Sequence, residues 1–287
     1  MKKWLYNHGE ALTGQMKTTV IPEEGLGIWY LGQETFLLKK GNKFILIDPY
    51  LTDYVDRFPE FEKGFWVRKY HSPVKPEDMD FIDFILCTHN HLDHMDPDTI
   101  RGVSSCNDRT GFVVPYPDVN DNEKLLAGKN IIYGAKVNEP LQFGELNIIP
   151  VPAAHGIFHR DNDGNYCELS YLIKWGNFIV FHGGDMKVYP ELPDILKGFD
   201  IDIAFLPING GDWLRDKQGI VGNMNFREAA DLGVEIGADL IVPIHFDLYD
   251  VNQENPAYFI DYIYHSYPGQ KYHIFQPGER MIYFKER

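Results

Sequence analysis

The sequence predicts an α/β protein whose core is one β-sheet packed on another, with helices outside. Two observations indicate this fold class. Short apolar runs of strand length come in two groups along the chain, and segments with helical spacing of apolar residues lie between them. Strands interleaved with helices in this way suit layered sheets covered by helices. The 287 residues contain no linker, low-complexity stretch or fixed-period repeat, so we expect a single domain over 1–287.

The first group of strands opens with a three-strand meander that turns at Gly41-Asn42. A helix is expected to begin at Asp96, an N-cap residue, with Pro97 in its first position. Residues 50–80 are aromatic and charged without a clean period, which indicates a long loop that acts as a lid or an oligomer contact. The strands expected in this group are 25–32, 35–40, 43–49, 83–88, 111–115, 129–134 and 145–153, with a short helix over 118–127.

The second group also consists of short strands interleaved with helices. Two strands pair around Gly176-Asn177, and Asn225 is an expected N-cap of the helix that follows it. The expected strands are 169–175, 177–185, 201–208 and 239–245, the expected helices are 193–198, 225–237 and 255–267, and short runs at 273–275 and 281–284 close the chain.

Charge and composition exclude several classes of protein. Lys and Arg number 27 against 42 Asp and Glu, a formal net charge of −15, which argues against binding nucleic acid. The longest apolar runs, such as FILI, are far shorter than a membrane span, and no targeting segment is recognised at the start. Three scattered cysteines indicate a reducing compartment, so we expect a cytoplasmic protein without a membrane partner.

The chemistry is concentrated in the segment Thr88-His89-Asn90-His91-Leu92-Asp93-His94, directly after a buried strand. His89 and His91, two residues apart, can point the same way from an extended segment. Asp93 and His94 follow on the turn into the next helix and can approach from another side. The spacing therefore suits two neighbouring metals better than one.

Three more ligand-type residues come at the ends of apolar strands: His155, Asp185 and His245. A lone histidine at a strand end is usually a structural residue. Together with the histidine cluster, however, these three become candidate ligands. Imidazole and carboxylate groups suit Zn²⁺, Mn²⁺ or Fe²⁺ and disfavour Ca²⁺.

The segment THNHLDH, with a later histidine, a GGD and a strand-ending histidine, resembles the metallo-β-lactamase superfamily. The resemblance implies an αββα sandwich, two mixed β-sheets with helices on the outer faces, and two divalent metal ions, Zn or Mn, between the sheets. By resemblance, the first metal would be held by His89, His91 and His155, and the second by Asp93, His94 and His245, with Asp185 bridging.

The chain also resembles one branch of that superfamily, the L-ascorbate-6-phosphate lactonase-like hydrolases. Asp247, directly after the phenylalanine that follows His245, is the most branch-specific feature. The stretches that carry this resemblance are 27–39, 84–96, 170–185, 201–210 and 240–256.

Several other residues are candidates for supporting roles. Asp48 and His182 could orient ligands by hydrogen bonding, or could be a turn residue and a buried strand histidine. Gln33 is expected near the site by resemblance to the branch. Asn209 and Arg215 are expected to contact an anionic substrate, with a simple turn and a solvated surface as the alternatives; Lys217 of the same loop is weighed in the same way.

These features predict a metal-dependent hydrolase. By resemblance, the metals would lower the pKa of a bound water from about 16 towards about 7, and the hydroxide would attack a carbonyl. The expected substrate is a small anionic lactone or ester such as a sugar-phosphate lactone, and Asp93 and Asp185 are the expected catalytic residues. The alternatives are a phosphodiesterase on the same two metals and an iron-dependent redox enzyme. A homo-oligomer is left open.

Overall fold

The computed structural model describes residues 6–59, 61–62, 64–126 and 128–285. The chain forms two compact units, the first from Met1–Ala135 with Phe275–Arg287 and the second from Lys136–Ile274. Each unit contains one seven-stranded sheet. The expectation of a single domain over 1–287 stays a prediction. In the described part of the chain, no helix combines the length and the apolar character needed to cross a bilayer.

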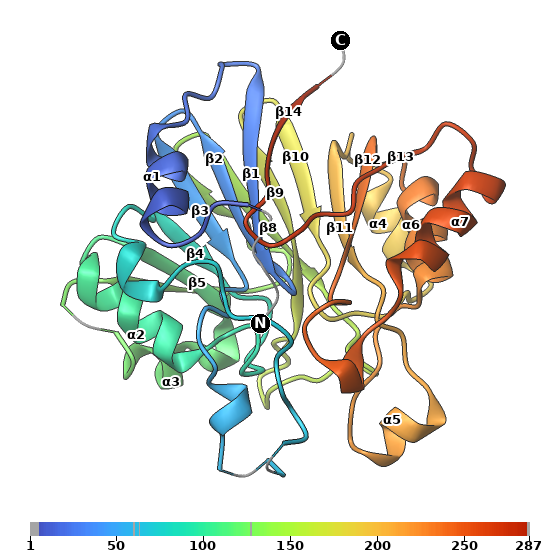
Figure 1. Cartoon of the computed structure of the whole chain (residues 1–287), viewed down its shortest axis with the longest axis horizontal. Helices are drawn as coiled ribbons and strands as arrows, with labels where there is room; N and C mark the ends of the chain where they lie inside the picture. The colour runs from blue at the N-terminus through green and yellow to red at the C-terminus, as the bar shows by residue number, and fades with distance from the viewer. Residues whose placement is uncertain (1–5, 60, 63, 127, 286–287) are drawn as a thin grey trace. The chain divides into compact units, whose positions relative to one another are not determined.

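The sheet of the first unit is mixed. Its β1, β2 and β3 form the expected antiparallel meander, and β3 to β6 run parallel. The last strand of the chain, β14, pairs antiparallel with β1 and lies beside it in Figure 1. The order is β14-β1-β2-β3-β4-β5-β6, with bounds β1 (Gly25–Gly32), β2 (Thr35–Lys40), β3 (Lys43–Ile47), β4 (Phe84–Leu86), β5 (Gly111–Pro115), β6 (Ile131–Ala135) and β14 (Arg280–Phe284).

Helices cover this sheet through apolar and capping contacts. Asp96 caps α2 by accepting a hydrogen bond from the backbone N–H of Asp98, and Pro97 occupies the first turn, as expected. The helix then buries Ile100 and Val103. The helical segments of the unit are α1 (Glu10–Thr18), α2 (Pro97–Cys106), α3 (Val119–Glu123) and the 3₁₀ turns η1 (Val55–Arg57), η2 (Pro76–Asp78) and η3 (Tyr116–Asp118).

The sheet of the second unit is also mixed. Strands β7 to β10 pair antiparallel, and β10 to β13 run parallel. The order is β13-β12-β11-β10-β9-β8-β7, with bounds β7 (Leu141–Phe143), β8 (Leu146–Pro152), β9 (Leu169–Trp175), β10 (Phe178–His182), β11 (Ile203–Pro207), β12 (Leu240–Ile244) and β13 (Lys271–Tyr272).

Helix α6 fixes the apolar layer on this sheet. Asn225 and Glu228 form a capping box at its start. The helix packs against β11, β12 and α7, and α6 and α7 lie side by side in Figure 1. A Cβ at Gly233 would lie 2.4 Å from Cδ1 of Ile241, so glycine permits this close approach. The helical segments are α4 (Leu192–Leu196), α5 (Trp213–Lys217), α6 (Phe226–Glu235), α7 (Pro256–Ser266) and the 3₁₀ turn η4 (Asp250–Asn252).

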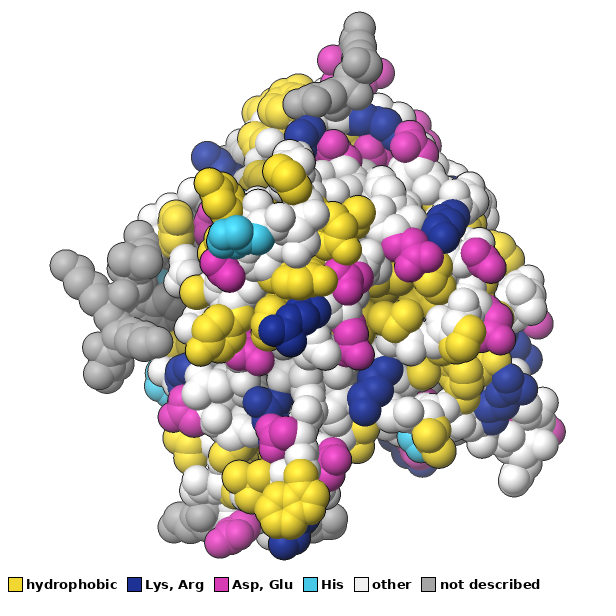
Figure 2. Space-filling view, turned by 90° about the vertical axis from the view of Figure 1, so that its right-hand side faces the viewer, with side chains coloured by type: hydrophobic (Ala, Val, Ile, Leu, Met, Phe, Trp, Pro, Cys, Tyr) yellow, Lys and Arg dark blue, Asp and Glu magenta, His cyan; other side chains and the backbone are white. Residues whose placement is uncertain are grey.

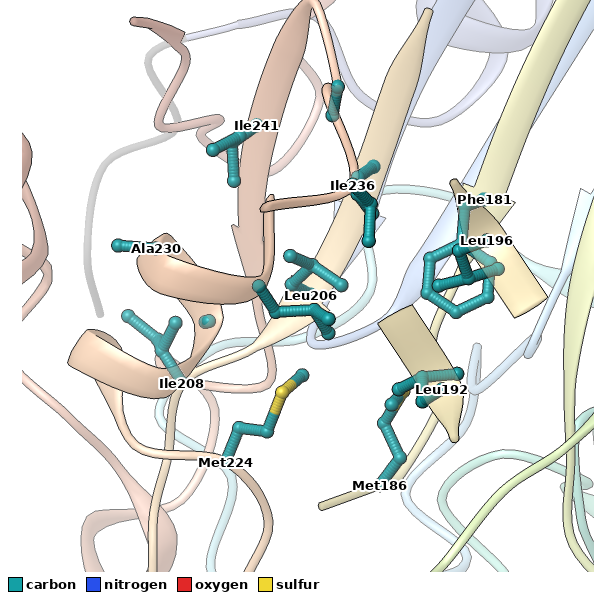
Figure 3. Close-up of a cluster of buried hydrophobic side chains, with 14 of the residues drawn as sticks. Phe181, Met186, Leu192, Leu196, Leu206, Ile208, Met224, Ala230, Ile236 and Ile241 are labelled. Carbon is teal, nitrogen blue, oxygen red and sulfur yellow. The ribbon is translucent and has the colours of Figure 1, made fainter. Parts of the chain in front are cut away.

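A buried apolar cluster joins these helices to the sheet. Figure 3 shows Leu206 of β11, Ile241 of β12 and Phe181 of β10 pointing into a layer that Leu192 and Leu196 of α4 also enter. Burying such side chains contributes about 1.5–3 kcal/mol each. The layer therefore fixes β10, β11 and β12, and with them the positions of the residues that follow these strands.

Several strands end one to three residues earlier than the sequence predicts, among them those expected over 43–49, 83–88, 145–153 and 201–208. Two further early ends decide where candidate ligands lie. The strand expected over 177–185 ends at His182: the backbone N–H of Gly183 still donates to the carbonyl of Phe205 in β11, and Gly184 then turns the chain with φ of 61°. The strand expected over 239–245 ends at Ile244, and His245 has φ of 56°. Asp185 and His245 consequently lie in loops rather than in strands.

Candidate metal centre

In the first unit, the site residues gather at the carboxyl ends of two neighbouring parallel strands, β3 and β4. Asp48 follows β3 and Thr88 follows β4. The Asp48 carboxylate accepts hydrogen bonds from the Thr88 backbone N–H and from the Thr88 hydroxyl, both at 2.7 Å. Asp48 is fully buried, and its Oδ2 lies 3.0 Å from Nδ1 of His94. Asp48 therefore orients the imidazole of His94, which stays a candidate ligand.

The three histidines of the cluster lie together. The ring centroid of His89 is 4.5 Å from that of His91 and 4.2 Å from that of His94. Nδ1 of His89 lies 3.0 Å from the Thr88 hydroxyl oxygen. His89 and His94 are buried, whereas His91 is exposed. His89 and His91 each offer a ring nitrogen within 4.8 Å of the other, a separation that one metal ion can bridge.

Asp93 stands beside this cluster and is held by Gln33. Nε2 of Gln33 donates to Oδ2 of Asp93 at 2.5 Å, and that oxygen lies 3.9 Å from Nε2 of His94. The backbone N–H of Gln33 donates to the hydroxyl of Tyr70 at 3.2 Å. The structure thus places Gln33 at the site and connects it to the 50–80 segment.

Sequence reasoning missed Glu34. This residue is fully buried, and its Oε2 lies 3.4 Å from Nδ1 of His94. Glu34 and His94 could each give a ligand atom to a metal. The sequence signal that could have identified Glu34 is its position in the two-residue turn between the buried strands β1 and β2. A carboxylate in such a turn is ordinarily expected to be solvated, so the residue was not chosen.

In the second unit, His155, Asp185 and His245 come together as expected. Nε2 of His245 lies 3.3 Å from Oδ1 of Asp185, and Nε2 of His155 lies 3.7 Å from Oδ2. All three side chains are buried. The Asp185 carboxylate therefore faces an imidazole with each of its oxygens, an arrangement in which one carboxylate can serve two metal ions.

Asn223 also belongs to this group and was missed. Its Nδ2 donates to Oδ1 of Asp185 at 2.5 Å, and its Oδ1 lies 3.0 Å from Nδ1 of His155. No sequence signal identified it, because a single asparagine in the loop before α6 looks like an ordinary turn residue.

The other candidates of this unit contact the protein itself. Asn209 is buried and accepts from Asn223 through its side-chain oxygen. The guanidinium of Arg215 donates to the carbonyl oxygens of Asn209 and Gln253 and pairs with Asp212. Nδ1 of His182 accepts from the backbone N–H of Gly184 at 3.2 Å, so His182 shapes the turn before Asp185. Nζ of Lys217 lies 4.3 Å from the centre of the Trp213 ring. Substrate contacts by Asn209 and Arg215 stay predictions.

Residues 43–246 match the sequence profile of the beta-lactamase superfamily domain, and the match includes all seven candidate ligands from His89 to His245. The chain belongs to the metallo-β-lactamase superfamily. The two mixed sheets with their helices have the α/β sandwich class expected of that superfamily, so the predicted fold class is confirmed.

Relatives match nearly the whole chain. A UPF0173 metal-dependent hydrolase of Pyrococcus furiosus is 28% identical over 88% of this chain and 98% of its own, and one of Caldivirga maquilingensis is 24% identical over 87% and 95%. Among solved structures, Igni18, described as a novel metallo hydrolase from Ignicoccus hospitalis, aligns with a TM-score of 0.66 at 19% identity, over 91% of this chain and 100% of that one. This structural likeness concerns the fold.

The donor set fits divalent transition metals. Imidazole nitrogens and carboxylate oxygens are the ligands of Zn²⁺ and Mn²⁺ sites of the superfamily type. Nδ1 of His89, of His94 and of His155 faces a polar partner, so Nε2 is the nitrogen that each of them could offer to a metal. Burial raises the pKa of the Cys87 thiol well above its ordinary value, and the groups of possible ligands found among the described residues consist of histidines and carboxylates.

Proposed function

We propose that this protein is a hydrolase that uses two divalent metal ions, Zn or Mn, to cleave a small anionic lactone or ester. Membership of the superfamily and the names of the relatives, metal-dependent hydrolases, support the general activity. The observation that carries the proposal is the set of histidines whose Nδ1 atoms are held by the protein, since this leaves Nε2 for a metal.

The assignment of ligands to two metals follows the resemblance to the superfamily. His89, His91 and His155 would hold one ion, Asp93, His94 and His245 the other, and Asp185 both. Bound divalent metals would supply a hydroxide at neutral pH and would polarise a carbonyl oxygen. Orientation of the reacting groups and proton transfer would be carried out by side chains of the protein.

The exposure and contacts of Asp93 support a role in proton transfer. Its side chain is 21% exposed, whereas that of His94 beside it is fully buried. Because Gln33 donates to Oδ2 of Asp93, the carboxylate keeps one orientation. Asp93 can thus orient an attacking hydroxide and pass a proton to the leaving oxygen.

We further propose a phosphorylated sugar lactone, or a close relative, as the substrate. The resemblance of 27–39, 84–96 and 240–256 to the ascorbate-phosphate lactonase branch supports this substrate class. The net charge of −15 does not oppose it, because charges are screened over about 8 Å and the nearest cations dominate.

The proposed partner is a small molecule in the cytoplasm rather than nucleic acid. On the face shown in Figure 2, Lys and Arg side chains lie among acidic and apolar ones without a continuous basic area. Phosphate-backbone binding needs such an area.

A hydrolysis screen of the metal-loaded protein tests the proposed function. The panel should contain phosphorylated and uncharged lactones, phosphodiesters and β-lactams, each run against the same protein after chelation. We expect turnover of a lactone that disappears on chelation and returns with Zn²⁺ or Mn²⁺. Turnover that survives chelation would contradict a metal-dependent hydrolase, and metal-dependent turnover of phosphodiesters alone would move the proposal to the phosphodiesterase.

A further inference from the structure

Three buried asparagines of the second unit form a chain of side-chain amides. Nδ2 of Asn209 donates to Oδ1 of Asn252 at 2.9 Å, and Nδ2 of Asn223 donates to Oδ1 of Asn209 at 3.1 Å. Asn223 then contacts both Asp185 and His155. At most 8% of any of these asparagines is exposed, so water does not compete for their hydrogen bonds.

The chemistry of the end group gives this chain a direction. An ionised carboxylate only accepts hydrogen bonds, so the atom of Asn223 that faces Asp185 must be the NH₂ group. The same NH₂ group reaches Oδ1 of Asn209. The carbonyl oxygen of Asn223 therefore faces Nδ1 of His155 at 3.0 Å, and that nitrogen must be the donor.

This direction sets the tautomer of His155. With the proton on Nδ1, Nε2 carries the lone pair, and Nε2 is the nitrogen that lies 3.7 Å from Asp185. We propose that Asn223 is a positioning residue that selects the metal-binding tautomer of His155 and fixes the Asp185 carboxylate, with Asn209 and Asn252 holding its amide in place. The inference rests on the proposed roles of His155 and Asp185 as metal ligands.

The backbone around Asn223 supports this role. The loops 209–211 and 222–225 are joined by backbone hydrogen bonds between Gly210 and Met224 at 2.9 Å and between Asn223 and Gly210 at 3.2 Å. A Cβ at Gly222 would lie 2.5 Å from Cα of Gly211, so the two loops touch through glycine. The guanidinium of Arg215 donates to the backbone carbonyls of Asn209 and of Gln253, the residue after Asn252. Backbone contacts therefore support all three asparagines of the amide chain.

The first test reads the tautomer in metal-free protein. Nitrogen NMR of labelled histidine distinguishes Nδ1–H from Nε2–H imidazole, and the His155 signals are assigned by their absence in His155→Ala. We expect the Nδ1–H form in the wild type and a mixture of both forms in Asn223→Ala. An Nε2–H imidazole in the wild type, or an unchanged signal in the variant, would overturn the inference without touching the proposed function.

The second test measures Zn²⁺ affinity. Asn223→Ala should weaken binding by about 10–100-fold, the range for residues that orient ligands. Asn225→Ala is the matched control: it lies in the same loop and caps α6, so it should lower stability but leave affinity unchanged. If Asn223→Ala does not fold, Asn252→Ala replaces it with a smaller expected loss. Equal affinity in the folded variant and the wild type would refute the inference, whereas a wild type that binds neither Zn²⁺ nor Mn²⁺ would refute the proposed function.

Discussion

The backbone is strained at three residues of the candidate site. Asp48, Gln33 and His245 have φ of 42°, 55° and 56°, in the left-handed region that residues other than glycine rarely occupy. Such conformations persist where the surroundings hold them, and they concentrate at functional sites. Each of the three closes a strand and turns its side chain into the site, so the side-chain contacts outweigh the strain.

Asp48 should be important for the stability of the protein as well as for the orientation of His94. Asp48→Ala removes the acceptor for two donors of Thr88 and leaves both buried. We expect the free energy of unfolding of metal-free protein to fall by roughly 2–4 kcal/mol in a denaturant titration. Asp48→Asn keeps an acceptor and should lose less. A change below about 0.5 kcal/mol in Asp48→Ala would contradict this role.

His91 should be important for activity but not for stability. Because its side chain is exposed, His91→Ala should leave the unfolding transition of metal-free protein unchanged. The variant should nevertheless lose hydrolysis at ordinary metal concentrations, since a ligand is missing. Activity assays at increasing Zn²⁺ check this expectation, and most of the wild-type activity at saturating metal would show that the ligand assignment is wrong.

Seven candidate ligands could be named from the sequence because histidines and aspartates after apolar strands are recognisable by residue type, and their role as ligands stays a prediction. Glu34 and Asn223 could not be named in this way. Their roles come from burial beside His94 and His155, which depends on how β1–β2 and the loop before α6 are folded.

At the scale of elements, the 50–80 segment is tied to the first unit at both ends. The Thr52 hydroxyl donates to Asp96 at 2.7 Å, and Tyr70 accepts from Gln33 beside Asp93. Between these ends, the ring of Phe61 lies 5.2 Å from Phe58 and 6.2 Å from Trp66. The segment thus carries packed aromatic rings and reaches Gln33 beside Asp93; the lid and the oligomer contact both stay predictions.

If the segment covers bound substrate, Trp66→Ala should raise KM several-fold and leave Zn²⁺ affinity unchanged, because Trp66 lies outside the ligand set. Steady-state kinetics and metal titration on the same preparation check this result. An unchanged KM together with a smaller assembly in sedimentation would favour the oligomer contact instead.

Strands inside the sheets were predicted well, because continuous burial leaves an apolar run, as in β1 and β11. The edge strands β7 and β13 were missed, and the run expected over 273–275 forms no strand. Helix α1 was missed. Gly9 gives it no side-chain cap, and its end is held by the ammonium of Lys39, a buried residue of β2 that donates to the carbonyls of Met16 and Thr19. Helix α5 has five residues and none buried, so it leaves no period in the sequence. Tertiary contacts decide such elements, and local sequence does not record them.

At the scale of the whole molecule, the charge of −15 implies that the proposed recognition of an anion would be a local effect of the metals. The ratio of kcat/KM for a phosphorylated lactone to that for its uncharged analogue should therefore exceed one and should fall as ionic strength rises towards about 1 M, where the screening length is about 3 Å. Kinetics with both lactones at low and high salt check this expectation. Equal kcat/KM for the two lactones at every salt concentration would show that the site does not recognise the anionic group.

The proposed function depends most on two metal ions, which this chain would bind through its candidate histidines and aspartates. Elemental analysis of carefully loaded protein, made on the wild type and on Asp185→Ala in parallel, tests this binding most directly. We expect two ions per chain in the wild type and weaker retention of metal in Asp185→Ala, because Asp185 faces both His155 and His245. At most one ion per chain, with the same affinity in Asp185→Ala, would contradict the proposed two-metal site.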